Sequence, residues 1–361
     1  MSKVLNFNAG PAALPPTVLE KVQSELRDYQ GRGMSIMEMS HRSKEFEAIN
    51  TRAEANFKKL LGLVEGYRVL FVQGGASSQF ATVPMNFLPK DGTADYIVTG
   101  SWGEKAIEEA GLFGKAHLAA STKEGGYKRV PSTGEVSLTE GSAYVHLTSN
   151  ETIQGVQFRD FPEVGDRPLV ADMSSDILSR PFDAGKFSLI YAGAQKNLGP
   201  SGVTVVLIRE SWIEKANKGV PTMLRYSTHA KNNSLYNTPP MFGVYVLDLV
   251  LQWLEGLGGL PGVARRNAQK AEILYGVIDG SGGYFKGHAE PASRSEMNVT
   301  FRLPSEALEK QFVTEAQAAG MVGLAGHRSV GGIRASIYNA IDVEACQALA
   351  SFMGDFAKKN G

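Results

Sequence analysis

The sequence is poor in cysteine, because Cys346 is the only one among 361 residues. A single thiol excludes an internal disulfide framework and suits a reducing compartment. Val343, Leu349 and Phe352 surround it at helical spacing, so we expect Cys346 to be a small core residue and not a nucleophile. The six histidines show no spacing typical of metal ligands, and we therefore expect no metal site.

An excess of charge is also missing, because 37 basic residues balance 37 acidic ones. Such a chain has no general attraction to nucleic acid or an anionic membrane, so any anion site has to be local. The longest apolar run, at residues 242–254, contains Asp248 and Gln252 and is too short to span a bilayer. The N-terminus has no basic flank followed by a long apolar core, so we expect no signal peptide. We therefore expect a cytoplasmic protein.

Small residues surround one lysine between two short apolar strands, which we expect at residues 188–192 and 203–208. The lysine, Lys196, lies in the run Gly193-Ala194-Gln195-Lys196-Asn197-Leu198-Gly199-Pro200. Loss of hydration in such a pocket lowers the pKa of an amine and makes it a nucleophile. The chemistry that most needs this amine is Schiff-base formation with a carbonyl, above all that of pyridoxal phosphate. An exposed strand-end lysine is the common alternative, so other residues have to decide.

A glycine turn follows the strand expected at residues 67–72. It has the sequence Gly74-Gly75-Ala76-Ser77-Ser78 and leads into a helix. The free N–H groups of a helix N-terminus, with serine hydroxyls beside them, can bind a phosphate. The glycine spacing matches neither a Walker A loop nor a dinucleotide fingerprint, so a cradle for one phosphate fits better.

Alternating helices and mostly apolar strands predict an α/β fold with a mostly parallel central sheet flanked by helices. Ligands collect at the carboxyl ends of parallel strands. Trp102, Thr152 and Asp172 each follow a predicted strand, so we expect them near one another. The polar stretch at residues 225–240 is predicted to be a long, functional loop.

A change in the pattern of predicted helices and strands divides the chain into two domains. We predict a large domain over residues 16–257 and a smaller C-terminal α+β domain over 258–361, with a hinge in the glycine-rich segment 256–262. Residues 1–15 are expected to be an N-terminal segment that packs with the small domain.

Two His-Arg-Ser sequences occur, at residues 41–43 and 327–329. His41 and Arg42 precede a predicted helix for which Ser43 is a plausible N-cap. Two cationic donors beside a helix N-terminus suit an anion, although an exposed His-Arg pair is the commoner case.

Together these segments resemble the phosphoserine aminotransferase family, which belongs to the class V, fold-type I pyridoxal-phosphate enzymes. The resemblance runs nearly end to end, through residues 7–12, 35–43, 99–102, 171–175, 193–197 and 326–334. Several separated segments in the same order are more specific than any one motif.

The resemblance implies roles for these residues. Lys196 would hold pyridoxal 5′-phosphate as a Schiff base, one per subunit, and would then move the substrate proton. Asp172 would pair with the pyridine nitrogen, Trp102 would stack on the ring, and Thr152 would bind the phenolic oxygen. The cofactor phosphate would bind Ala76, Ser77 and Gln195, with Asn237 and Thr238 from the partner subunit of a homodimer that shares its active sites.

The implied reaction interconverts 3-phosphohydroxypyruvate and L-glutamate with O-phospho-L-serine and 2-oxoglutarate, as in serine biosynthesis. A related use of 4-phosphohydroxythreonine, in pyridoxine biosynthesis, stays open. Arg334 would bind the α-carboxylate as a bidentate fork. The distal phosphate would be bound by His41, Arg42, His327 and Arg328.

One position departs from part of the family, in which an arginine occurs where this chain has Ala76-Ser77. Here the phosphate would depend on backbone N–H groups, the Ser77 hydroxyl, the helix dipole and the partner's loop.

Other functions fit the sequence less well. Another class V enzyme, such as a serine–glyoxylate aminotransferase, would have little use for two His-Arg pairs. A cysteine desulfurase would need a histidine before the lysine and a mobile cysteine, whereas this chain has Gln195 and a helical Cys346. A non-catalytic binder of phosphorylated metabolites would not need Lys196. Neither net charge nor a basic stripe supports nucleic-acid binding.

Overall fold

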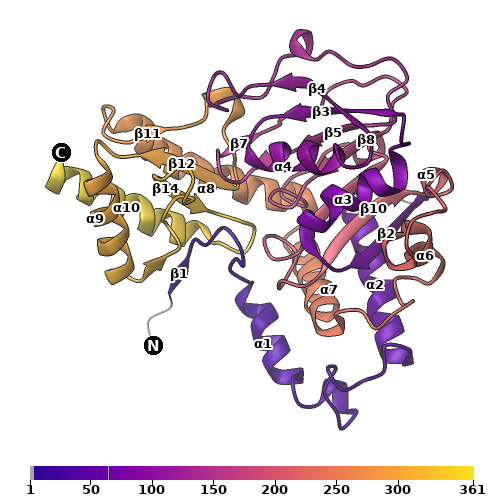
Figure 1. Ribbon diagram of the computed structural model, residues 1–361. Coiled ribbons are helices and arrows are strands. Elements are labelled where there is room, and N and C mark those ends of the chain that lie inside the picture. Colours follow the sequence, from indigo (N-terminus) through magenta and orange to yellow (C-terminus); the bar gives the residue numbers. More distant parts are fainter. Residues whose placement is uncertain (1–3, 64) are drawn as a thin grey trace.

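A seven-stranded sheet forms the centre of the computed structural model, which describes residues 4–63 and 65–361 (Figure 1). All pairs are parallel except those of β10, which runs antiparallel to both β9 and β2. The predicted mostly parallel sheet is therefore confirmed. In spatial order the strands are β2 (Tyr67–Val72), β10 (Thr204–Arg209), β9 (Leu189–Gly193), β8 (Leu169–Asp172), β5 (Val145–Thr148), β3 (Thr93–Val98) and β4 (Lys115–Ser121).

Helices cover both faces of this sheet, which explains why its strands read as nearly continuous apolar runs. One face packs against a core that includes residues of α2 (Lys44–Leu60) and α7 (Met241–Gly256). The other packs against α3 (Gly75–Phe87), α4 (Ser101–Ala110), α5 (Glu210–Ile213) and α6 (Tyr226–Lys231). Ser43 caps α2 as predicted, because its hydroxyl accepts a hydrogen bond from the Phe46 N–H at 3.3 Å.

The C-terminal elements form a second group with its own core (Figure 1). An antiparallel sheet joins β11 (Lys286–Gly287), β12 (Asn298–Arg302) and β14 (Ile333–Ser336). It packs with α8 (Gly259–Gly280), α9 (Glu306–Ala318) and α10 (Val343–Asn360). Cys346 lies fully buried in this core, as predicted.

The N-terminal strand joins this second group. β1 (Leu5–Asn6) pairs in parallel with β13 (Met321–Val322), and Phe7 is buried in the C-terminal core. The chain then crosses through α1 (Pro16–Glu25) to the large sheet. The domain boundaries drawn from the sequence stay a prediction.

Smaller elements complete the described chain. β6 (Asn150–Glu151) and β7 (Val156–Gln157) form an antiparallel hairpin. Single 3₁₀ turns lie at Tyr29–Gly31, Thr133–Glu135, Ala184–Lys186, Thr222–Leu224 and Pro291–Ser293. No single helix among the described residues is long and apolar enough to cross a membrane, and the one pair that passes by length and composition, α7 with α8, bends by 82° at its break.

One sequence prediction of local structure was wrong. The segment 225–240 is not a continuous loop, because it contains α6. Two contacts outside the helix stabilise it, and no local sequence pattern predicts them. The buried Tyr226 hydroxyl donates to Gln79 at 2.6 Å, and a His229 ring nitrogen lies 2.8 Å from the Met223 carbonyl.

Candidate active site

Lys196 lies in the turn that follows β9, and its side chain is partly buried. Its amine donates a hydrogen bond to the Thr152 hydroxyl at 2.8 Å and lies 5.8 Å from the centre of the Trp102 ring. Burial lowers the pKa of Lys196 to about 8, while the nearby carboxylate of Asp172 opposes this shift. The amine is therefore enclosed and unusually easy to deprotonate, which argues against an exposed strand-end lysine.

A cavity of about 240 Å³ opens beside this amine. Its lining comes from five separated segments of the chain. It includes seven of the nine residues predicted to bind the cofactor: Ala76, Ser77, Trp102, Thr152, Asp172, Gln195 and Lys196. The expectation that Trp102, Thr152 and Asp172 lie near one another is therefore confirmed, while the roles of the seven residues toward a cofactor stay a prediction.

Asp172 is the last residue of β8 and is buried. Its carboxylate accepts a hydrogen bond from the Ser174 N–H at 2.9 Å. Burial raises its pKa, and the positive charge of Lys196 opposes that rise. A buried carboxylate and a buried amine thus share one cavity, as an acid–base site requires.

The glycine turn at the start of α3 forms another wall of the cavity. Gly74 and Gly75 have left-handed φ values of 95° and 65°, and a Cβ on Gly74 would lie 2.0 Å from the Ser78 hydroxyl. Only glycine allows this tight entry into the helix. Ala76 and Ser77 follow in the first turn of α3, where N–H groups have no partner within the helix.

Glu151 is a buried residue of the site to which the sequence analysis gave no role. Its carboxylate accepts hydrogen bonds from the N–H groups of Trp102 at 3.0 Å and Gly103 at 2.8 Å. It thereby holds the N-terminus of α4 and the position of the Trp102 ring. Burial raises the pKa of Glu151 to about 7. The only signal in the sequence was its place beside Thr152 in a polar cluster after a strand.

Three predicted substrate residues come together in the C-terminal part. Arg334, on β14, lines a cavity of about 360 Å³, and its buried Nε atom has no hydrogen-bond partner among the described residues. Burial and the charges of Arg334 and Arg328 lower the pKa of His327. Arg334 also lowers the pKa of Lys196, so its field reaches the amine.

The other predicted residues lie apart from this cavity. A ring nitrogen of His41 lies 3.2 Å from the Thr238 hydroxyl, next to an exposed Arg42. Asn237 donates a hydrogen bond to the Thr238 carbonyl at 3.3 Å. None of these four residues lines the Lys196 cavity in the described part of the chain. Neither His-Arg pair lines the Lys196 cavity among the described residues.

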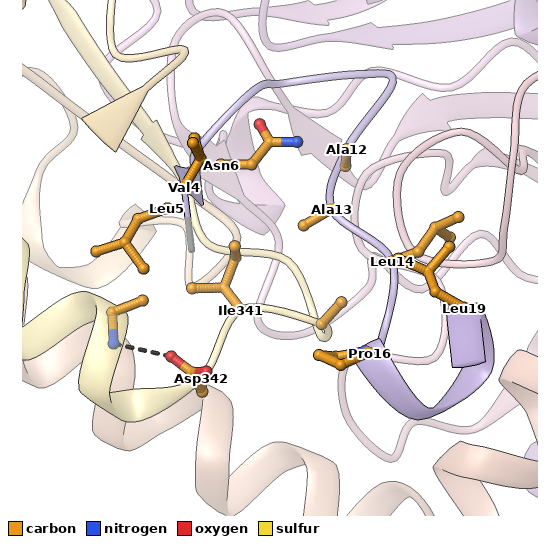
Figure 2. A pocket seen from close by; sticks show the side chains of 12 residues that line it. Val4, Leu5, Asn6, Ala12, Ala13, Leu14, Pro16, Leu19, Ile341 and Asp342 are labelled. Atoms are coloured by element: carbon orange, nitrogen blue, oxygen red, sulfur yellow. Dashed lines mark hydrogen bonds between the residues drawn. The ribbon is translucent and has the colours of Figure 1, made fainter. Parts of the chain in front are cut away.

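A larger cavity, of about 540 Å³, lies between the N-terminal segment and the start of α10 (Figure 2). Its walls are mostly apolar, and Asp342 is the only ionisable side chain among the described residues that line it. Asp342 caps α10 by accepting a hydrogen bond from the Ala345 N–H at 2.8 Å. Because the one ionisable group in this lining caps a helix, whereas the Lys196 cavity holds an amine beside a carboxylate, the Lys196 cavity is the candidate active site.

Known proteins are similar to this chain along nearly its whole length. The family model described as Aminotransferase class-V matches residues 4–349. A phosphoserine aminotransferase from Herpetosiphon aurantiacus is 64% identical over 358 residues, 99% of each chain. The chain belongs to the phosphoserine aminotransferase family. The family prediction made from separated sequence segments is therefore confirmed.

Solved structures of family members agree in fold. That of phosphoserine aminotransferase from Bacillus circulans subsp. alkalophilus is 57% identical, covers 100% of both chains and has a TM-score of 0.99. A pyridoxal-phosphate-bound phosphoserine aminotransferase from Trichomonas vaginalis is 37% identical, with 98% of this chain and 100% of that chain covered and a TM-score of 0.91.

Proposed function

We propose that this member of the phosphoserine aminotransferase family carries out the family's reaction, interconverting 3-phosphohydroxypyruvate and L-glutamate with O-phospho-L-serine and 2-oxoglutarate. It is a pyridoxal-phosphate-dependent aminotransferase. The observation that carries this proposal is the convergence of seven predicted cofactor residues, including Lys196, on one cavity.

The residues of the cavity fit pyridoxal phosphate. Lys196 supplies an amine for the covalent link, and the first turn of α3 supplies N–H groups for the phosphate. The Trp102 ring nitrogen and the Thr148 hydroxyl are buried without a hydrogen-bond partner among the described residues, as expected where a polar ligand binds. When bound, the cofactor supplies an electron-accepting pyridine ring.

The chain's own groups then act on the substrate. The Lys196 amine, released when substrate binds, takes the proton from the substrate Cα as a general base. Thr152 holds this amine at 2.8 Å, and burial keeps its pKa near that of a useful base, at about 8. Asp172, as a buried carboxylate, would hold the proton on the pyridine nitrogen. Trp102, whose backbone N–H is held by Glu151, would stack on the ring.

Arg334 binds the α-carboxylate that phosphoserine and glutamate share. Its guanidinium forms two parallel bonds with a carboxylate, and its unpartnered Nε is ready to donate one of them. His327 and Arg328 bind the distal phosphate of phosphoserine or the distal carboxylate of glutamate in turn.

The contact between His41 and Thr238 supports a shared site. If Thr238 and Asn237 bind the cofactor phosphate of a second subunit, His41 and Arg42 also lie at that subunit's cavity, because Thr238 and His41 are in direct contact. We therefore propose a homodimer in which each subunit contributes these four residues to its partner's cavity. The single buried thiol supports a cytoplasmic location.

The visible spectrum of the purified holoenzyme tests the function. The wild type should absorb as an imine of pyridoxal phosphate, lose that band with phosphoserine but not with serine or alanine at equal concentration, and recover it with 2-oxoglutarate. Lys196→Ala should lack the band. The matched control Lys186→Ala, an exposed lysine paired with Glu163, should behave as wild type. Bleaching by serine instead would support another class V aminotransferase, and no band at all would favour a non-catalytic binder.

A further inference from the structure

Residues Gly326–Gly332 form a loop, here called the clamp loop, which carries His327 and Arg328. Its two ends are joined, because the Gly326 N–H donates to the Gly332 carbonyl at 2.8 Å. The N–H groups of Val330 and Gly331 donate to the His327 carbonyl at 3.0 and 2.8 Å. The loop thus turns back on itself and presents both basic side chains from one short segment.

The clamp loop has little packing of its own. It separates two cavities, of about 360 and 670 Å³, and Gly326, Val330 and Gly331 line both. Val330, its only large apolar residue, is 45% exposed. With open space on both sides, something other than apolar contact has to fix its position.

An ion pair outside the loop provides that support. Arg302, at the end of β12, donates from Nη1 to the Val330 carbonyl at 2.6 Å, and its Nε lies 2.6 Å from Glu309 Oε1. Glu309, on α9, is only 7% exposed, and its Oε2 accepts a hydrogen bond from the Gly332 N–H at 3.2 Å. The pair therefore holds the loop backbone at two points just after His327 and Arg328.

The loop lies directly against the Arg302 side chain. Gly332 has a left-handed φ of 76°, and a Cβ there would lie 2.7 Å from Arg302 Cδ and 2.9 Å from the Phe301 carbonyl. No other residue type fits this approach without displacement. The position of Arg302 thus determines where the loop backbone lies.

Arg334 is held in a different way. It lies on β14, where its backbone is in register with Thr300 of β12. The sheet therefore fixes the proposed α-carboxylate site, whereas the Arg302–Glu309 pair fixes the loop for the distal anion.

We propose that Arg302 and Glu309 are positioning residues for the distal anion of the substrate, an inference that rests on the proposed function and deepens it. Arg302 does not itself bind the anion, because its charge is neutralised by Glu309. It holds the clamp loop so that His327 and Arg328 meet a phosphate. Sites that bind phosphate through several donors need their geometry maintained within a fraction of an ångström.

Holoenzymes carrying Arg302→Met or Glu309→Gln test this role. We expect the KM for phosphoserine to rise about tenfold while kcat changes less than about twofold, since ground-state and transition-state binding weaken together. The single-turnover rate with L-alanine, which has no distal anion and reacts only at a far higher concentration than phosphoserine, should stay at the wild-type value. Glu315→Gln is the matched control, because Glu315 lies on the same helix and pairs with Lys359 at 3.2 Å.

Arg302→Lys is a milder variant that keeps the charge while removing the guanidinium fork, and it should give an intermediate KM. An unchanged KM for phosphoserine in Glu309→Gln and Arg302→Lys would overturn the proposal. An equal loss with phosphoserine and alanine would also overturn it, because it would show general damage to the small domain.

Inorganic phosphate separates this test from the proposed function. Calorimetric titration of the holoenzyme with phosphate should show a Kd about tenfold weaker in both variants than in wild type. A wild type that does not transaminate phosphoserine would contradict the proposed function alone. Equal phosphate affinity in wild type and variants, or no phosphate binding by any of them, would contradict the role of the ion pair.

Discussion

The Lys196 amine and the Thr152 hydroxyl are joined by a hydrogen bond of 2.8 Å across the active-site cavity. The hydroxyl comes from the hairpin that follows β5, and the amine from the turn that follows β9. Two strand ends of the same sheet thus orient the nucleophile before any ligand binds, which reduces the ordering that binding requires.

Covalent uptake of pyridoxal phosphate by the apoenzyme should depend on pH through Lys196. Only the neutral amine attacks the aldehyde, and burial lowers its pKa from 10.5 to about 8. We therefore expect the uptake rate, followed by absorbance after mixing, to rise with pH and level off above about 8. Asp172→Asn removes a charge that raises this pKa, so its profile should shift to lower pH. A wild-type rate that still climbs through pH 10.5 would contradict the enclosed amine.

Glu151→Gln should weaken cofactor binding through Trp102. Both carboxylate oxygens accept an N–H group, and an amide nitrogen cannot, so one of the two donors would lose its partner at a cost of about 1–3 kcal/mol. Titration of the apoenzyme with pyridoxal phosphate, read by Trp fluorescence, should show lower affinity than wild type. The surface variant Glu163→Gln should leave affinity unchanged, since Glu163 contacts only exposed Lys186 among its described partners.

The same variant has a consequence for stability. Burial raises the folded-state pKa of Glu151 from 4.5 to about 7, so the unfolded chain releases this proton first. Its contribution to the free energy of unfolding therefore falls as pH rises from 4.5 to 7. Thermal midpoints measured across this range should decline more steeply for the wild type than for Glu151→Gln. Parallel curves would show that Glu151 is ionised throughout.

Mixed dimers test the shared site. Lys196→Ala and Arg42→Ala subunits, mixed after reversible dissociation, should regain activity, because one site of each mixed dimer unites an intact Lys196 with an intact Arg42. Random pairing predicts recovery of about a quarter of the wild-type sites. A mixture of Lys196→Ala with Asp172→Asn should stay inactive, since both residues line the same cavity. No recovery in the first mixture would mean that Arg42 acts within its own chain.

Much of the fold was predictable because local signals agreed with the global pattern. The apolar runs before Gly74 and Asp172 are strands buried on both faces. The Ser43 cap depends on one hydrogen bond, to the N–H of a residue three positions later. The shared placement of Trp102, Thr152 and Asp172 at strand ends followed from the parallel sheet, whereas their proposed roles came from the family resemblance. Such features depend on residues close together in the sequence or on a general rule of sheets.

The features that escaped prediction depend on distant partners. Glu151 is buried because the N-terminus of α4, about fifty residues earlier, needs its oxygens, and the order of the chain does not reveal this. Helix α6 exists because Tyr226 reaches Gln79. His41 contacts Thr238 and not His327, and this likewise follows from the packing of α2 beside α7.

The pairing of β1 with β13 bears on how the polypeptide is made. Leu5 and Asn6 leave the ribosome before every strand of the central sheet, whereas Met321 and Val322 emerge after all of them. β1 can therefore pair with β13 only after the entire central sheet has been translated. Assembly of the C-terminal core around Phe7 therefore follows the synthesis of the whole central sheet.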